Sequence, residues 1–272
     1  MTRHAGAERR TTTSYAGAER RTATSHAGAN VRALALPIDP PPADGVLRHL
    51  GIDECVRLPL RVDAGRIAAE LRTLSDDTWT GASRDPVVQA SVRSFFAIGH
   101  PRGPRPLPPE DRAPLAHLPY LRHVLRDLVP ATPTRAIVAR LEPHGLIPIH
   151  RDTARFFRHT VRLTFAVSAD GPQRLLCDGV FYAQEPGEVW AISNLVPHAV
   201  HHTGDAPRVN VLADYLPSHD LLALLARGER GLGVRDHDAT RAIEQLSRER
   251  YRTHRWRGIG WEIFKRVWRR RA

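Results

Sequence analysis

The sequence is short of cysteine, of lysine and of long apolar runs. Its two cysteines, Cys55 and Cys177, have no C-x-x-C spacing, so neither a disulfide framework nor a zinc site is predicted. No apolar run approaches the ~20 residues that a membrane-spanning helix needs. Arg9-Arg10 is not followed by the apolar segment of a secretory signal. We therefore expect a cytoplasmic protein without a transmembrane segment, whose thiols stay reduced.

The positive charge is almost entirely arginine, because Lys265 is the only lysine, and it is unevenly distributed. The formal net charge is +11. Residues 31–218 hold 21 arginines against 20 acidic residues, whereas residues 219–272 hold 14 basic residues against seven acidic ones. The central part is therefore nearly neutral, which argues against a nucleic acid as the ligand of an active site there.

Composition divides the chain into three regions. Residues 5–29 contain an imperfect eleven-residue repeat that is poor in large apolar residues, so it cannot bury enough surface to offset chain entropy. A proline-rich linker follows at Pro37–Pro42. We predict a disordered basic repeat with its linker at 1–42, a catalytic domain at 43–218, and a basic helical C-terminal region at 219–272.

The pattern of apolar residues and turn signals predicts a mainly β fold with flanking helices. A strand is expected at Leu58–Leu60, a helix at Ala64–Leu74 capped by Asp63, a strand at Ser91–Ile98, and a helix at Leu118–Leu128. Eight short strands separated by glycine and proline turns then follow, at 136–142, 146–150, 159–167, 173–176, 180–182, 188–193, 198–202 and 208–214. This series predicts a double-stranded β-helix barrel of the jelly-roll or cupin type. Helices are expected at Ser218–Ala226, Ala239–Arg250 and Trp261–Arg271.

The chemistry is concentrated between residues 140 and 214. An apolar strand ends in the triplet His150-Arg-Asp152, and side chains two apart on a strand point the same way. His198 follows some tens of residues later. Two imidazoles and one carboxylate form the facial triad that binds Fe(II) and leaves positions open, which a 2-oxo acid and dioxygen can fill. Arg208, ten residues beyond His198, is placed to bind the far carboxylate of such a co-substrate.

Several neighbouring residues compete for these roles. His201 and His202 are alternatives to His198 as the third ligand, since a strand would point His202 to the same side. Arg140 could be an ion-paired rim residue or take part in the site. Trp190 is expected in the core, because Gly187-Glu-x-Trp leads into a buried strand.

In combination these motifs resemble the aspartyl/asparaginyl β-hydroxylase-like 2-oxoglutarate oxygenases, which include bacterial proline hydroxylases. The resemblance covers roughly residues 57–216, and the matching segments lie at Arg140-Leu-x-Pro-x-Gly-x-Ile-x-x-His150-x-Asp152, Val161-Arg162-Leu163, Gly187-Glu-x-Trp190, Asn194, His198, Arg208 and Asp214. Where many members have R-x-H, this chain has Arg162-Leu-Thr164.

The resemblance implies a hydroxylase that uses Fe(II), 2-oxoglutarate and O2. His150, Asp152 and His198 would be the iron ligands, and Arg208 the anchor of 2-oxoglutarate. Arg162 and Thr164 would lie near the co-substrate. The expected substrate is a small molecule or a peptide, hydroxylated at an unactivated C–H of an amino acid or amino-acid residue.

Two other functions are compatible with the sequence. One is a cupin-type metal enzyme that does not use 2-oxoglutarate, and the other is a non-catalytic binding or regulatory protein on the same fold. In the C-terminal run, Trp261, Phe264 and Trp268 share a helix face among arginines. That face could pack on the barrel, form a homodimer, or bind an acidic partner.

Overall fold

The computed structural model describes residues 45–81, 87, 90–99, 110–168 and 173–253. The N-terminal repeat, the proline-rich linker and the expected helix at Trp261–Arg271 lie outside the described residues. The predicted domain boundaries at residues 42 and 218, and a homodimer or acidic partner at the C-terminal helices, stay predictions. None of the helices within the described part is long and apolar enough to cross a membrane.

The described chain forms two antiparallel sheets, as the sequence predicts for a double-stranded β-helix. The six-stranded sheet has the order β1-β8-β5-β10-β3-β2, and the four-stranded sheet the order β4-β9-β6-β7. The strands are β1 Val56–Arg61, β2 Val92–Ile98, β3 Pro133–Leu141, β4 Leu146–His150, β5 Val161–Ser168, β6 Gln173–Cys177, β7 Val180–Gln184, β8 Glu188–Ile192, β9 His198–His201 and β10 Arg208–Tyr215. All eight predicted strands after residue 133 are confirmed. The strand expected from 159 begins later because Arg155–Arg158 form a 3-10 turn, η4.

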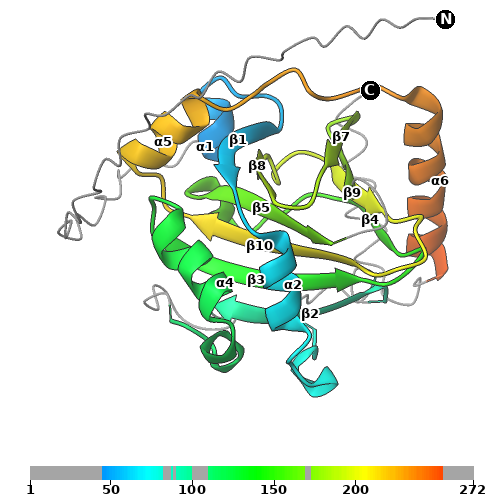
Figure 1. Cartoon of the computed structure of the whole chain (residues 1–272). Coiled ribbons are helices and arrows are strands. Elements are labelled where there is room, and N and C mark those ends of the chain that lie inside the picture. Colours follow the sequence, from blue (N-terminus) through cyan, green and yellow to red (C-terminus); the bar gives the residue numbers. More distant parts are fainter. Residues whose placement is uncertain (1–44, 82–86, 88–89, 100–109, 169–172, 254–272) are drawn as a thin grey trace, which may run out of the picture. The chain divides into compact units, whose positions relative to one another are not determined.

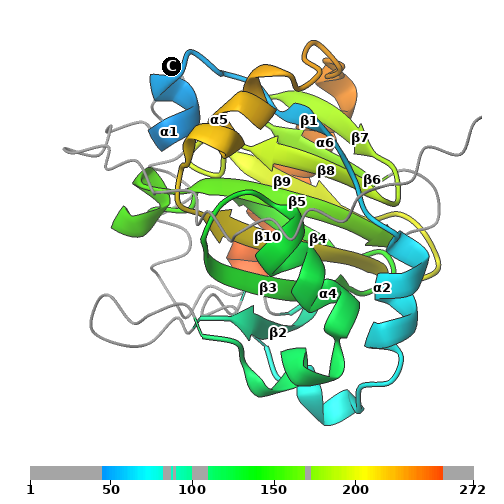
Figure 2. The same ribbon diagram turned by 60° about the vertical axis from the view of Figure 1, so that its left-hand side comes forward.

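Helices cover the two sheets on different sides (Figures 1 and 2). The short helix α1 (Gly45–His49) was not anticipated from the sequence, whereas α2 (Ala64–Leu71) was, with Asp63 accepting a hydrogen bond from the Arg66 N–H at 2.9 Å. The helix expected at Leu118–Leu128 is divided into α4 (Pro119–His123) and a π-helical turn, η3 (Val124–Leu128). Short 3-10 turns lie at Asp76–Thr78 (η1) and Ala113–His117 (η2), and α5 (His219–Ala226) and α6 (His237–Thr253) confirm two further predicted helices.

Alternation along each strand separates two apolar layers. On β5 and β10, Leu163, Phe165, Val211 and Ala213 are fully buried in one cluster with residues of α2, α4 and α5. A second cluster lies between the sheets and contains Leu141, Leu175, Cys177, Tyr182, Trp190, Ile192 and Val200. The strand residues that alternate with the first cluster therefore face the space between the sheets, where the polar residues discussed below lie.

The C-terminal helix α6 packs on the outer face of the four-stranded sheet (Figure 1). Ile243 of α6 shares a cluster with Ile149 of β4. Because β4 is an edge strand, Ile149 has unpaired backbone groups, and α6 satisfies them. The Ser247 hydroxyl accepts from the Ile149 N–H at 3.0 Å, and the Tyr251 hydroxyl donates to the Ile149 carbonyl at 3.3 Å. Side chains thus replace a missing strand there.

The Gly187-Glu-x-Trp190 motif has a structural explanation at each of its three positions. Gly187 has φ +87°, and a Cβ there would lie 2.8 Å from the Val62 carbonyl oxygen, so a larger residue is excluded. The buried Glu188 carboxylate accepts from the Trp190 indole at 2.9 Å, the Glu185 N–H at 3.0 Å and Arg57 at 2.8 Å. Trp190 lies in the core between the sheets, as expected.

Glu188 should make stability depend on pH. Burial alone would raise the pKa of its carboxyl, but the hydrogen bonds from Glu185, Trp190 and Arg57 outweigh burial and hold it below the ordinary value. Glu188→Gln should therefore lower the free energy of unfolding by about 3 kcal/mol at pH 7. A carboxyl whose pKa is lowered in the folded state contributes its full stability only above its pKa in the unfolded state. The difference in unfolding free energy between the wild type and Glu188→Gln should therefore shrink as the pH falls through the folded-state pKa. Urea unfolding at several pH values measures both effects.

The matched control is Glu229→Gln. Glu229 pairs with the same Arg57, but its side chain is 60% exposed, so its loss should cost less than about 1 kcal/mol. Equal losses in the two variants would contradict a special role for the buried carboxylate.

Candidate metal and co-substrate site

The three residues predicted as metal ligands come together at the ends of two paired strands. His150 ends β4 and His198 begins β9, and the two are register partners with ring centroids 4.2 Å apart. Asp152 lies just beyond β4, where its N–H donates to the Asn194 carbonyl at 2.9 Å. One potential ligand atom from each of the three residues lies within 4.8 Å of the others. Within the described chain this group contains His198, and neither His201 nor His202.

Backbone contacts determine which imidazole nitrogens face the centre of this group. The Nδ1 of His150 lies 2.8 Å from the Pro148 carbonyl oxygen, and the Nδ1 of His198 lies 2.9 Å from the Val196 carbonyl oxygen. A carbonyl can only accept, so each Nδ1 carries a proton, and Nε2 is the nitrogen whose lone pair can bind a metal. Burial, followed by the nearby charge of His150, lowers the pKa of His198 to about 3, which keeps that ring neutral at physiological pH.

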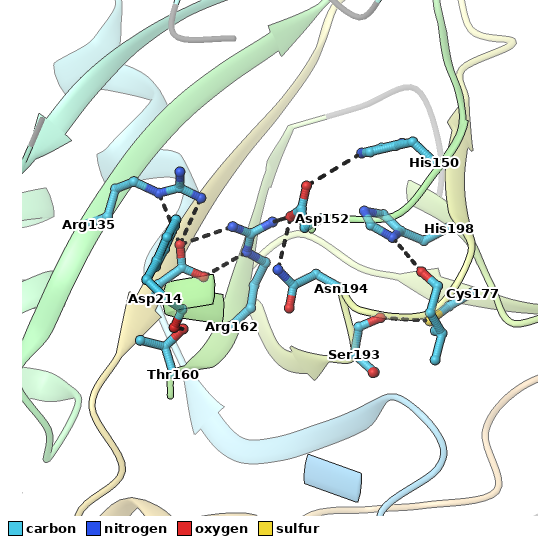
Figure 3. A network of polar contacts seen from close by, with 12 residues as sticks. Arg135, His150, Asp152, Thr160, Arg162, Cys177, Ser193, Asn194, His198 and Asp214 are labelled. Carbon is cyan, nitrogen blue, oxygen red and sulfur yellow. Dashed lines mark hydrogen bonds and ion pairs between the residues drawn. The ribbon is translucent and has the colours of Figure 1, made fainter. Parts of the chain in front are cut away.

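The Asp152 carboxylate is held from the side opposite the histidines (Figure 3). Its Oδ2 accepts from the Asn194 amide at 2.9 Å and from Nη1 of Arg162, while Oδ1 lies 3.9 Å from Nε2 of His150. Burial would raise the pKa of Asp152, but the charge of Arg162 and then those of the two histidines lower it well below its ordinary value. Asp152 is therefore an anion oriented toward the histidines, and two imidazoles with one carboxylate suit a divalent transition metal with positions left open.

Arg162 connects this group to a second carboxylate deeper in the large sheet. Its Nε and Nη2 donate to the two oxygens of Asp214, both at 2.9 Å, while Nη1 reaches Asp152. Nε of Arg135 donates at 3.0 Å to Oδ2 of Asp214, the oxygen that also accepts from Nη2 of Arg162 (Figure 3). The structure thus places Arg162 against two carboxylates. The expectation that it also contacts a co-substrate stays a prediction.

Arg208, the predicted anchor, has a different environment. It opens β10, is 5% exposed, and donates from Nε to Oε1 of Gln173 at 3.0 Å. Among the described residues no Asp or Glu forms an ion pair with it, and burial alone lowers its pKa to about 10. A buried guanidinium without a carboxylate is costly unless a ligand supplies the negative charge. This environment fits the far carboxylate of a 2-oxo acid.

The remaining candidates take no part in the His150, Asp152 and His198 group. His202 is buried with Nε2 against the Ala206 carbonyl, and His201 is only partly buried. Arg140 donates to Glu142 at 3.2 Å and lies over the Trp79 ring, 5.4 Å from its centroid. Sequence reasoning matched Asn194 and Asp214 only as family positions, and it missed Gln173 and Gln184. A polar residue at an inward-facing strand position is the signal that could have identified both glutamines.

Comparison with known proteins agrees with the sequence motifs. Residues 109–217 match the model of the aspartyl/asparaginyl β-hydroxylase family, which confirms the resemblance over that stretch. The upstream segments from residue 57 lie outside the match. A search of curated protein sequences finds no match to this chain.

Distant structural likenesses are also found. An oxidoreductase of the 2OG-Fe(II) oxygenase family from Burkholderia pseudomallei is 17% identical, covers 62% of this chain and 86% of its own, and has a TM-score of 0.44. A prolyl hydroxylase from Trichoplax adhaerens, in complex with a hypoxia inducible factor peptide fragment, is 12% identical over 66% and 90% of the two chains, with a TM-score of 0.41. A cupin 2 domain-containing protein from Halorhodospira halophila is 14% identical, covers 66% of this chain and 90% of its own, and has a TM-score of 0.30. These likenesses are too distant to assign a function.

Asn194 should determine how well Asp152 is positioned for a metal. Asn194→Ala removes one donor to the Asp152 carboxylate, so affinity for Mn(II) or Fe(II) should fall about tenfold to a hundredfold. Anaerobic titration calorimetry without co-substrate measures this affinity. Asn210→Ala is the control, since Asn210 is also buried but forms no hydrogen bond to Asp152 in the structure. Unchanged metal affinity in Asn194→Ala would show that the contact does not orient a ligand.

Proposed function

From the match of residues 109–217 to the aspartyl/asparaginyl β-hydroxylase family, we propose that this chain is an Fe(II)- and 2-oxoglutarate-dependent dioxygenase that hydroxylates an amino acid or an amino-acid residue in a peptide. The observation that supports this proposal most directly is the combination of two sites. One is the group of two imidazoles and a carboxylate, and the other is the buried arginine, which has no anionic partner among the described residues. A metal enzyme that used no dicarboxylate would have no need of the second.

Under this proposal His150, Asp152 and His198 hold Fe(II), and Arg208 binds the far carboxylate of 2-oxoglutarate. When bound together, iron and 2-oxoglutarate supply the activation of O2 and the hydroxylation of an unactivated C–H, with release of succinate and CO2. The protein provides orientation. Asn194 and Arg162 fix the Asp152 carboxylate, and the Pro148 and Val196 carbonyls fix the two rings.

Burial of the site gives the chain a second task, the exclusion of water. His198 and Arg208 are 7% and 5% exposed, so their contacts form in a low-dielectric interior where charge interactions are strong. His150 and Asp152 are less buried, with side chains 19% and 20% exposed. The substrate would therefore approach from the side of His150 and Asp152, while the co-substrate extends inward toward Arg208.

The proposal is tested by succinate release. Purified protein supplied with Fe(II), 2-oxoglutarate and ascorbate is screened against free amino acids and peptides, and a mass gain of one oxygen atom identifies the product. Asp152→Ala should abolish turnover, because it removes the only anionic ligand. Arg208→Met should raise the KM for 2-oxoglutarate by at least about tenfold, because a charge-assisted contact is lost.

Thermal melting of both variants shows whether they remain folded. A cupin-type enzyme that uses no 2-oxoglutarate would release no succinate and would form its product without 2-oxoglutarate, in the wild type and in Arg208→Met alike. A non-catalytic binding protein would release no succinate with any substrate and would show no spectral change when 2-oxoglutarate is added to the anaerobic Fe(II) protein.

A further inference from the structure

Five buried polar side chains lie deep between the two sheets, away from the ends of β4 and β9. Arg208 and Asn210 come from β10, Thr164 from β5, Gln173 from β6 and Gln184 from β7, and each is no more than 7% exposed. Thr164, Arg208 and Asn210 alternate along their strands with residues of the first apolar cluster. Gln173 and Gln184 lie on the same side of their strands as the residues that β6 and β7 contribute to the second cluster. All five side chains therefore face the space between the sheets. Buried polar groups are normally hydrogen-bonded, so each of these five side chains needs a hydrogen-bond partner.

Gln173 fixes the position of Arg208. Its amide nitrogen donates to two backbone carbonyls, those of Ser168 at 3.2 Å and Val209 at 2.9 Å. The register between β5 and β10 shifts at Val209, so the glutamine satisfies carbonyls at an irregularity of the ladder. Because both amide hydrogens are used, Oε1 must face away from these carbonyls, and it accepts from Nε of Arg208. Gln173 therefore orients the guanidinium without neutralising it.

Gln184 holds Thr164 in the same manner, but part of its amide stays unsatisfied. Nε2 donates to the Thr164 hydroxyl at 3.3 Å, and the buried Oε1 has no hydrogen-bond partner among the described residues. If the oxygen and nitrogen of the Gln184 amide are exchanged, the Thr164 hydroxyl donates to Oε1 instead, and the amide N–H groups no longer bond to Thr164. In either orientation the pair keeps at least one donor for a ligand, which is the Thr164 hydroxyl proton in the first case and a Gln184 N–H in the second.

The two glutamines are neighbours, which places the groups they hold close together. Gln173 and Gln184 are direct register partners on β6 and β7. Directly opposed side chains of an antiparallel pair project to the same face and lie side by side. The two neighbouring glutamines thus hold a guanidinium that no described carboxylate neutralises and a neutral donor, and a carboxylate can bind both kinds of group.

We propose that Gln173 and Gln184 are positioning residues that set the specificity of the co-substrate anchor. Gln173 orients Arg208 and leaves its charge to the far carboxylate of a 2-oxo dicarboxylic acid, and Gln184 presents Thr164 as the second donor. This inference rests on the proposed function. It adds that neutrality at position 173 makes the site select a dicarboxylate over a 2-oxo monocarboxylate.

The test compares two ligands that differ only at the far end, 2-oxoglutarate and 2-oxovalerate, which has a methyl group in place of the far carboxylate. Anaerobic calorimetry on the Mn(II)-loaded full chain gives a Kd for each. The wild type should bind 2-oxoglutarate at least about tenfold more tightly than 2-oxovalerate. In Gln173→Glu the new carboxylate pairs with Arg208, so this preference should fall toward unity while Mn(II) affinity is unchanged.

Gln173→Met gives a second measurement that does not depend on a new charge. It removes the acceptor for Nε and should weaken 2-oxoglutarate about tenfold while leaving 2-oxovalerate unaffected. Gln184→Met should produce a smaller loss with the same selectivity. Gln245→Glu, on the exposed face of α6, is the matched control for a glutamine-to-glutamate change and should bind both ligands as the wild type does.

The outcomes separate this inference from the proposed function. A wild type that shows no preference for 2-oxoglutarate overturns the proposed function itself. A wild type that shows the preference, with Gln173→Glu and Gln173→Met retaining it, overturns only the role of the glutamines. A merely structural role would lower the melting temperature and weaken both ligands by the same factor.

Discussion

The structure of the site depends on one buried guanidinium, that of Arg162, which joins Asp152 to Asp214. Burial alone would lower the pKa of Arg162, but the charges of Asp214 and Asp152 outweigh it and raise the pKa above the ordinary value. Removal of one member of such a group leaves an uncompensated charge in the interior, which typically costs about 3–5 kcal/mol. Asp152 is therefore oriented by the folded chain before any metal arrives, and β5, β10 and the loop after β4 are fixed relative to one another by the same contacts.

Arg162 and Arg208, which both face the space between the sheets, have opposite electrostatic environments. Arg162 contacts two carboxylates and has its pKa raised, whereas Arg208 contacts a neutral amide and has its pKa lowered to about 10. Both are almost fully buried. A group with its charge satisfied by the protein is structural, and one with its charge unsatisfied is ready for a ligand. The contrast follows from what the neighbouring strands place opposite each arginine, a difference that burial alone does not reveal.

Sequence reasoning predicted those features that follow from a local pattern. The short apolar runs separated by glycine and proline turns located the eight strands, and the H-x-D triplet at a strand end located His150 and Asp152. The sequence also indicated His198 and Arg208, since each begins a strand. The division of Leu118–Leu128 and the late start of β5 are irregularities that propensity does not resolve. Gln173 and Gln184 were missed because their importance comes from contacts with Arg208 and Thr164 on strands that do not follow theirs in the sequence, and an isolated glutamine in an apolar run signals only a polar position.

The C-terminal region shows how a distant part of the chain supports the site. β4 ends in His150 but has an open edge, and an edge strand whose backbone groups face an apolar layer would be poorly held. Ser247 and Tyr251 of α6 occupy that edge at Ile149, one residue before His150, and Arg250 of the same helix contacts Ser91, next to β2. Arg241, Arg248 and Arg252 lie on the exposed side of α6. Its inward side fixes the strand from which one proposed metal ligand projects, so charge alone does not define the role of this region.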